Sequence, residues 1–201
     1  MNAKRKKLID TLKKESDLLS LQLEKIINAR SFPKDAFSYN PLNYARDSFF
    51  TYIDNYAHCP LDALFLGMNP GPNGMMQTGI PFGDVSFVKN YLGIQSGVHT
   101  PSKEHPKRPI LGFDCPKGEV SGTRLWSFFQ SEFPDPNSFF KKFFVLNYCP
   151  LGFLSATGAN VTPDKIELDT RKKIEMLCDE FLLKCVPLFE VKTRRSGWLR
   201  H

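Results

Sequence analysis

The sequence lacks the cysteine spacing of a metal site. No two of its 5 cysteines stand in a C-x-x-C pattern, and their number is odd. Zinc ribbons and iron–sulfur clusters need thiolates grouped by short loops, so we expect no metal and no cofactor of this kind. The pattern favours reduced, mostly buried thiols of an intracellular protein. They are Cys59, Cys115, Cys149, Cys178 and Cys185.

Long apolar runs are also missing. None approaches the length that crosses a bilayer, so we expect no membrane partner. The basic start, MNAKRKKLIDTLKK, is not followed by the apolar core of a signal peptide. Its KRKK segment is either a weak nuclear address or, as the favoured alternative, a solvated and disordered start. The net charge of +6 favours an anionic partner without proving one.

Hydrophobic periodicity predicts alternating helices and strands, and we see no internal repeat. The helix at 8–27 should dock on its own domain, because its apolar pattern is too short for a coiled coil. Residues 31–45 and 94–120 should be irregular, with 193–201 as a tail. We expect further helices at 45–56, at 84–93 and from Thr162 to about Cys185. Another helix should be capped by Ser121 and should bury Leu125, Phe128 and Phe129. Strands are expected at 62–67, 141–150 and 188–192.

This alternation indicates an α/β protein with a central, mostly parallel sheet flanked by helices. Ligands of such folds bind beyond the carboxyl ends of the strands. Asn69 and Asn147 each follow a predicted strand, so we expect both to face one pocket. Residues 65–83, which include Asn69, hold five glycines and three prolines (FLGMNPGPNGMMQTGIPFG) but match neither G-x-x-x-x-G-K-[ST] nor G-x-G-x-x-G. Alone, this loop is a weak signal.

Longer motifs carry a resemblance. GMNPGPNGMMQTGIPFG (67–83) resembles the first active-site motif of the single-strand-selective monofunctional uracil-DNA glycosylases, within the uracil-DNA glycosylase superfamily. Three further segments are similar to that family: NPLNYA, EHPKRPILGFDCPKGEVSGTRLWSFF and FFVLNYCPLGFL. The likeness runs from about Tyr39 to about Lys192. It implies a uracil-DNA glycosylase-like domain over 39–192, preceded by a basic helix and connection (1–38) and followed by an unrelated tail (193–201).

The resemblance implies which residues bind the base. Asn147 matches the residue that reads uracil, whose edge offers an O4 acceptor beside an N3–H donor. A flipped amide would suit cytosine, so something must hold the amide orientation. Phe82 matches the aromatic on which the extruded base stacks. Met68 matches a main-chain contact to the base. Gly71 matches a position that leaves room for oxidised 5-substituents.

Asn69 matches the catalytic residue that positions the attacking water. An amide orients water but cannot act as a general base at neutral pH. Cleavage through an oxocarbenium-like state needs a placed water more than a strong nucleophile. These motifs offer no lysine as an amine nucleophile, in keeping with a monofunctional enzyme that leaves an abasic site.

DNA is therefore the expected partner, and base-excision repair by a monomer in the nucleus is the expected setting. The base must leave the stack, which is easiest in single strands. Two segments, 104–109 and 156–173, should hold the phosphates; ordinary solvated surface is the alternative for each charge. The resemblance and the residue types point to Lys107, Arg108, Thr157, Gly158, Asn160, Thr162, Lys165 and Arg171.

The sequence departs from its family at one place. We find no His-Pro-Ser-Pro motif, whose histidine donates to uracil O2 and whose loop wedges into the duplex. His58, His99, His105 and His201 stand in other contexts. Losing such a donor lowers a rate by roughly 10²–10³, so we expect this C-terminally shortened form, with its last strands and helices missing, to be impaired. A non-catalytic DNA-binding remnant of the same fold is one alternative, and an unrelated nucleotide-binding α/β protein is another.

Overall fold

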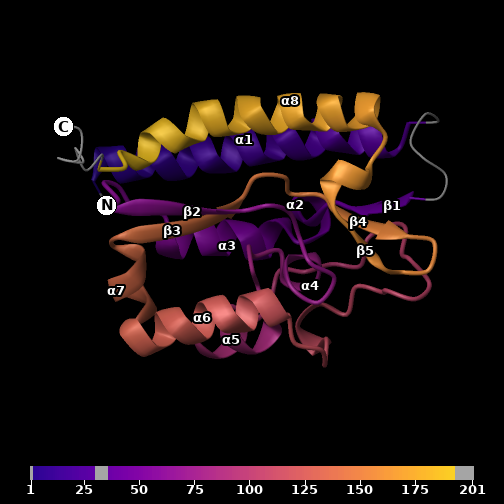
Figure 1. Cartoon of the computed structure of the whole chain (residues 1–201). Helices are drawn as coiled ribbons and strands as arrows, with labels where there is room; N and C mark the ends of the chain where they lie inside the picture. Colours follow the sequence, from indigo (N-terminus) through magenta and orange to yellow (C-terminus); the bar gives the residue numbers. More distant parts are fainter. Residues whose placement is uncertain (1, 30–35, 193–201) are drawn as a thin grey trace, which may run out of the picture.

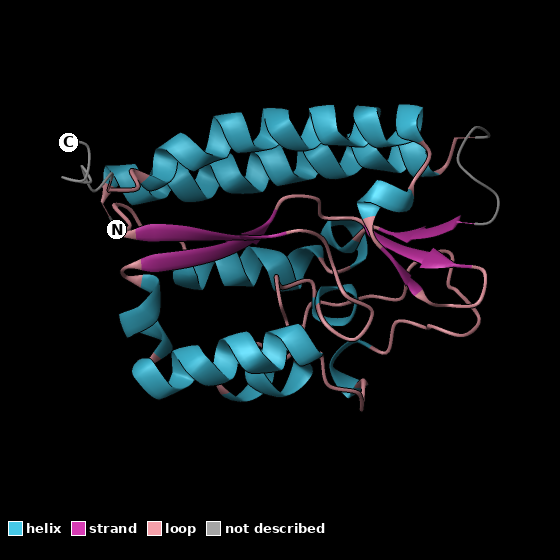
Figure 2. Cartoon of the chain, viewed as in Figure 1, coloured by secondary structure: helices cyan, strands magenta, loops and turns pink. Residues whose placement is uncertain are grey.

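A computed structural model describes residues 2–29 and 36–192 (Figures 1 and 2). Its helices and two small sheets confirm the α/β class. The elements follow the order α1 (Ala3–Ile27), β1 (Ala36–Tyr39), α2 (Pro41–Tyr44), α3 (Arg46–Tyr56), β2 (Ala63–Gly67), α4 (Met75–Thr78), α5 (Val85–Asn90), η1 (Gly112–Asp114), α6 (Val120–Glu132), α7 (Pro136–Phe140), β3 (Phe143–Asn147), β4 (Gly152–Ser155), β5 (Asn160–Val161), η2 (Pro163–Lys165), α8 (Leu168–Cys185) and η3 (Val186–Phe189).

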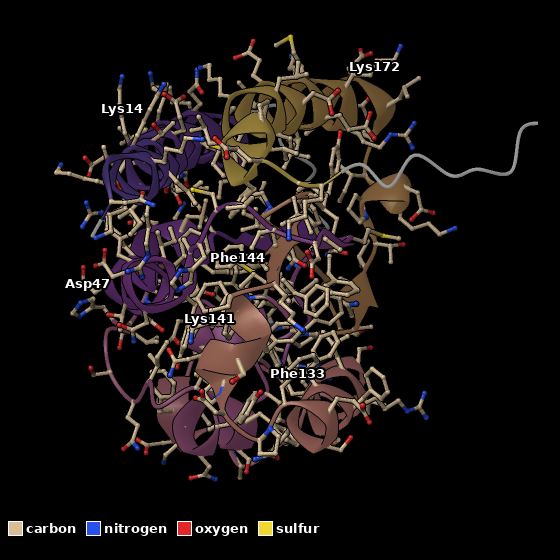
Figure 3. All side chains as sticks on the ribbon, turned by 90° about the vertical axis from the view of Figure 1, so that its left-hand side faces the viewer. Lys14, Asp47, Phe133, Lys141, Phe144 and Lys172 are labelled. Carbon is tan, nitrogen blue, oxygen red and sulfur yellow. The ribbon has the colours of Figure 1, made fainter. Side chains whose placement is uncertain are left out.

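β2 and β3 form the parallel pairing of the described strands, whereas the other two pairings are antiparallel, so the expected central, mostly parallel sheet is not confirmed. β2 pairs with β3 from Ala63↔Phe143 to Gly67↔Asn147, so two of the predicted strands are confirmed. α1 and α8 lie side by side on one face of this pair, and α3, α5 and α6 lie on the other side (Figure 1). Phe144 of β3 is fully buried between these layers, whereas Lys14 and Lys172 project outward from the helix pair (Figure 3). Within the described ranges, the parallel part of the fold has only these two strands.

A second, antiparallel sheet was not expected from the sequence. It has the order β1-β4-β5 and lies beyond the carboxyl ends of β2 and β3 (Figure 1). β1 occupies part of the segment predicted to be irregular, and β4 and β5 occupy a stretch with no predicted strand. Strands of four, four and two residues are too short to show a period-2 pattern.

The third predicted parallel strand, at 188–192, is wrong. The chain instead leaves α8 directly into the 3-10 helix η3, and Glu190 turns it with a left-handed backbone (φ 47°). Short apolar runs do not distinguish a strand from a helical continuation. The segment nevertheless lies against the start of β2, because Phe189 and Lys192 exchange backbone hydrogen bonds with Leu61. The tail predicted at 193–201 lies outside the described residues.

The basic N-terminus is helical. α1 begins at Ala3, so a disordered KRKK start is the wrong interpretation. The Arg5 guanidinium donates to the carbonyl oxygens of Ala57 and Asp54 at 2.9 Å each, and Lys4 pairs with Glu190. The apolar stripe of α1 belongs to the same core cluster as β2, β3 and α8, which agrees with a helix docked on its own domain.

Details of two later helices differ from expectation. Glu119, rather than Ser121, caps α6 by accepting from the Gly122 N–H. Trp126 is fully buried, whereas Phe128, predicted to be buried, is 61% exposed. Thr162 precedes only the short η2, and α8 starts later, with Glu167 as its cap. Helix boundaries shift easily because several polar side chains nearby can serve as caps.

Candidate functional site

The carboxyl ends of β2 and β3 bring the two motifs together. Gly67 stands opposite Asn147 in the strand register. Beyond the strands, Tyr148 N–H donates to Gly67 O at 2.8 Å, and Cys149 N–H donates to Met68 O at 3.0 Å. These bonds hold the chain that leads to Asn69 beside the chain that follows Asn147. Both asparagines therefore follow neighbouring strands at one edge of the parallel pair, but Asn69 does not line the cavity beside Asn147, so the shared pocket stays a prediction.

Phe82 and Asn147 meet at Gly67. A Cβ built on Gly67 would clash with Asn147 Oδ1 and would lie 2.6 Å from Cε2 of the Phe82 ring. Glycine is required here because any side chain would separate the ring from the amide. The predicted stacking aromatic and the predicted base-reading amide are thus neighbours.

The backbone of Phe82 is held in an unusual conformation. Its φ of 54° is in the left-handed region, which a bulky residue rarely adopts unless its surroundings enforce it. Its carbonyl oxygen accepts from Asp84 N–H at 2.8 Å and from Nε1 of Trp126 at 3.0 Å. A Cβ on Gly122 would clash with the same oxygen, so α6 packs directly under this turn. These contacts hold the Phe82 backbone in the left-handed conformation, and this conformation sets the direction of its ring.

The Asn147 side chain is 8% exposed, and its amide has a defined partner. Nδ2 donates to the Met75 sulfur at 3.1 Å. Asn147 and Met75 also line a cavity of about 20 Å³, which has room for one water and not for a pyrimidine. This cavity therefore does not confirm the expected base-sized pocket. A base would have to contact Asn147 from outside this cavity. A larger cavity, of about 470 Å³ between α1 and β1, shares no lining residue with it.

The remaining base-site candidates lie along the loop after β2. Asn69 is half-buried, and its Nδ2 donates to Pro70 O at 3.4 Å. Met68 is 60% exposed, with its carbonyl engaged by Cys149. A Cβ on Gly71 would lie 3.3 Å from Oε1 of Glu119, so a carboxylate stands beside the position expected to leave room. The motif pattern did not single out Glu119, and only its place as a helix cap could have drawn attention to it.

The two segments predicted to bind DNA lie against each other. Nε of Arg108 donates to Gly158 O at 2.8 Å, and a Cβ on Gly158 would lie 3.2 Å from His105. His105 is buried, with its Nδ1 accepting from Lys107 N–H. The Lys107 side chain itself is exposed. Arg108 thus joins the two loops, and Lys107 is the freer cation to meet a phosphate.

The other DNA-contact candidates are spread over β4 to α8. Thr157 shares a hydrogen bond with Ser155, and Asn160 begins β5. Lys165 and Arg171 pair with Asp164 and Glu175 at 3.6 and 3.5 Å. Thr162 lowers the pKa of the Asp164 carboxyl by hydrogen bonding. Both cations have carboxylate neighbours, so they offer less net positive charge than the sequence alone indicates.

Tyr148, directly after Asn147, joins the site to α8. Its hydroxyl donates to Oδ1 of Asp179 at 2.8 Å. Burial, and then this hydrogen bond and the Asp179 charge, raise the pKa of the Tyr148 phenol well above its ordinary value. Tyr148 is therefore a neutral donor that fixes the turn after β3.

The described ranges show no metal cluster and no bilayer span. No group of three or more metal-ligating side chains is found there. None of the helices in the same ranges has both the length and the apolar character to cross a membrane. His58, His99 and His105 do not line the cavity beside Asn147. All five cysteines are unpaired, and Cys149, Cys178 and Cys185 are buried.

Comparison with solved structures defines the class. The fold is similar to that in the crystal structure of wild-type Pedobacter heparinus SMUG2, with a TM-score of 0.55 and 20% sequence identity over 87% of this chain and 72% of that one. At this identity the likeness concerns the fold alone. No protein-family model matches the chain.

Sequence comparison then confirms the resemblance. The chain is 44% identical over 173 residues to the single-strand selective monofunctional uracil DNA glycosylase of Mus musculus, covering 86% of this chain and 62% of that protein. It is 42% identical over 185 residues to that of Bos taurus, covering 92% and 65%. The chain is therefore a relative of the single-strand-selective monofunctional uracil-DNA glycosylases. It spans somewhat less than two thirds of their length.

Proposed function

We propose that this chain is a monofunctional DNA glycosylase that hydrolyses the N-glycosidic bond of uracil in DNA. The observation that carries the proposal is the meeting of the Phe82 ring and the Asn147 amide at Gly67, at the edge where Asn69 also lies. An aromatic face beside an amide is the chemistry that binds a flat base and reads its edge. The curated relatives named above, which carry the same activity in their names, support it.

In this mechanism the target base leaves the stack and lies against Phe82. Asn147 donates from Nδ2 to uracil O4 and accepts the N3–H at Oδ1. Asn69 holds a water for attack on the sugar carbon as the C–N bond breaks and the base departs as an anion. The amide cannot remove the proton of this water, so the water adds to an oxocarbenium-like sugar and then loses its proton to the solvent. The step relies on stabilisation of the departing base.

We also propose a range of substrates that includes 5-substituted, oxidised uracils, in single strands and duplexes. The support is the missing side chain at Gly71. Glycine places no side chain of its own beside C5 of the base, and the neighbouring group is the Glu119 carboxylate, 3.3 Å from where a Cβ would stand. Relative excision of uracil, 5-hydroxymethyluracil and thymine from matched oligonucleotides tests this range.

The rate of the 201-residue chain is a separate question. The sequence has no His-Pro-Ser-Pro motif, so we assign no histidine of this chain to donate to uracil O2. We propose that the chain turns over roughly 10²–10³-fold more slowly than the Mus musculus relative. Side-by-side excision assays measure the ratio, and equal turnover would refute the proposal.

A non-catalytic DNA binder is the second candidate, favoured by the same observation. A gel-shift with abasic DNA, run beside an excision assay on single-stranded uracil DNA, separates the two. Binding with no release of uracil supports the binder, whereas release that is lost in Asn69→Ala supports the glycosylase. Monomeric state and nuclear location stay predictions, to be tested by light scattering and by imaging of a tagged chain.

A further inference from the structure

An asparagine that reads a base edge has an ambiguity built into it. Its amide offers one donor group and one acceptor, and rotation by half a turn exchanges them. One orientation pairs with uracil and the other with cytosine. Selective recognition by Asn147 therefore depends on a neighbour that favours one orientation over the other.

Met75 is such a neighbour. Its sulfur lies 3.1 Å from Nδ2 of Asn147. A thioether sulfur accepts a hydrogen bond weakly and cannot donate one. It therefore favours the orientation that turns the NH₂ group toward it. The reverse orientation would set the carbonyl oxygen against the sulfur with no hydrogen between them.

The contact between Nδ2 of Asn147 and the Met75 sulfur is shielded from water. Met75 is 2% exposed and Asn147 is 8% exposed, so little water competes for the amide. The other end of the amide, Oδ1, faces Gly67 beside the Phe82 ring. The NH₂ group of Asn147 carries two hydrogens, so one can point to the Met75 sulfur while the other, on the same side as Oδ1, stays available to the O4 atom of the base.

The backbone fixes Met75 in place. It is the first residue of α4, and its carbonyl oxygen accepts from Gly79 N–H at 2.8 Å. Gly79 closes the helix with a φ of 76°, a conformation that suits glycine. The glycine-rich loop therefore serves a second purpose, which is to hold a sulfur atom under the amide.

We propose that Met75 is a specificity-determining positioning residue, whose sulfur holds the Asn147 amide in the orientation that selects uracil over cytosine. This inference rests on the proposed function, because it takes Asn147 as the base reader. Met75 acts through Asn147 and has no role in bond cleavage.

The test is equilibrium binding of the chain to two single-stranded oligonucleotides. Each carries one 2′-fluoroarabino nucleotide, with uracil in one and cytosine in the other, so that the glycosidic bond resists cleavage. Met75→Leu removes the acceptor but keeps an apolar side chain of similar size. We expect the preference for uracil over cytosine to fall about fivefold, as for loss of one net hydrogen bond.

Met76→Leu is the matched control. Met76 is equally buried, packs on Gly152 and belongs to the same helix, so it reports a general loss of packing. It should leave the preference unchanged. An unchanged preference in Met75→Leu, or an equal fall in Met76→Leu, would overturn the inference. A wild-type chain that binds both oligonucleotides equally would instead overturn the proposed role of Asn147, and Met75 with it.

Norleucine in place of methionine keeps the inference testable if Met75→Leu does not fold. This exchange replaces only sulfur by a methylene group. The norleucine-containing wild-type chain should show the same loss of preference. A preference identical to that of the methionine-containing chain would contradict the role of the sulfur.

Discussion

The Phe82 ring and the Asn147 amide lie against the same face of Gly67, with no room for a Cβ between them. The ring comes from the end of the glycine-rich loop and the amide from the end of β3. We place the extruded base beside this pair, against the ring and the amide, and not between them. Several expected outcomes depend on this relationship.

Gly67→Ala should abolish most of the activity while the protein still folds. The added methyl group would push the ring and the amide apart, and a displacement of about 1 Å at a reacting site can lower a rate about 10²-fold. The measurement is uracil release under single-turnover conditions. Gly93→Ala is the control, because Gly93 has φ 65° but open space around it, so it loses stability without touching the site. Equal activity losses in both variants would contradict the placement.

Asn147→Asp should lose uracil recognition. The carboxylate has no hydrogen to donate to uracil O4 and repels that oxygen. A site built to hydrogen-bond its substrate loses up to about 10⁴-fold in rate when that hydrogen bond cannot form. Excision of uracil should fall by at least about 10²-fold, on the same grounds. Asn90→Asp, on the exposed side of α5, is the control and should behave as wild type. Retention of full activity in Asn147→Asp would exclude it as the base reader.

Asn69→Ala should separate binding from chemistry. Removal of the water-positioning amide should lower kcat by roughly 10²–10⁴ and leave affinity for uracil-containing DNA nearly unchanged. Asn73→Ala, in the same loop and also half-buried, provides the comparison. A lowered affinity with unchanged kcat would show that Asn69 binds the base instead.

The sequence predicted which residues follow the two parallel strands, but it did not predict the residues that hold their side chains in place. Asn69 and Asn147 were found because apolar runs bounded by glycine or proline mark buried strands, and parallel strands end together. Met75 and Trp126 were missed as partners of Asn147 and Phe82. Their contacts join residues far apart in the chain, and no local pattern records such an approach. Strand 188–192 was mispredicted because a run of five residues fits either secondary structure.

Trp126→Phe should loosen the Phe82 turn. The change removes the Nε1–H donor to Phe82 O and part of a fully buried ring, which together stabilise the fold by about 1–3 kcal/mol. Chemical denaturation measures the loss of stability, and binding of uracil DNA should weaken as well. Phe129→Leu, also buried on α6, should lower stability and leave the binding affinity of the folded protein unchanged.

Lys107→Ala should weaken DNA binding regardless of sequence. Lys107 is exposed on the loop that packs against Gly158, and loss of one phosphate contact lowers the salt slope of log K by about 1. Lys141→Ala is the control, because Lys141 precedes β3 at the end of the parallel pair away from Asn147 (Figure 3). Identical salt slopes for Lys107→Ala and wild type would show that Lys107 contacts no phosphate and that the DNA binds at another surface.

Release of free uracil from a single-stranded oligonucleotide that carries one uracil is the most direct measurement. We predict slow release by the wild-type chain, about 10²-fold or more above that of Asn147→Asp and of Gly67→Ala. Release at the same rate by all three proteins would contradict a uracil site built where Phe82 and Asn147 meet, and release by none of them would contradict the glycosylase activity.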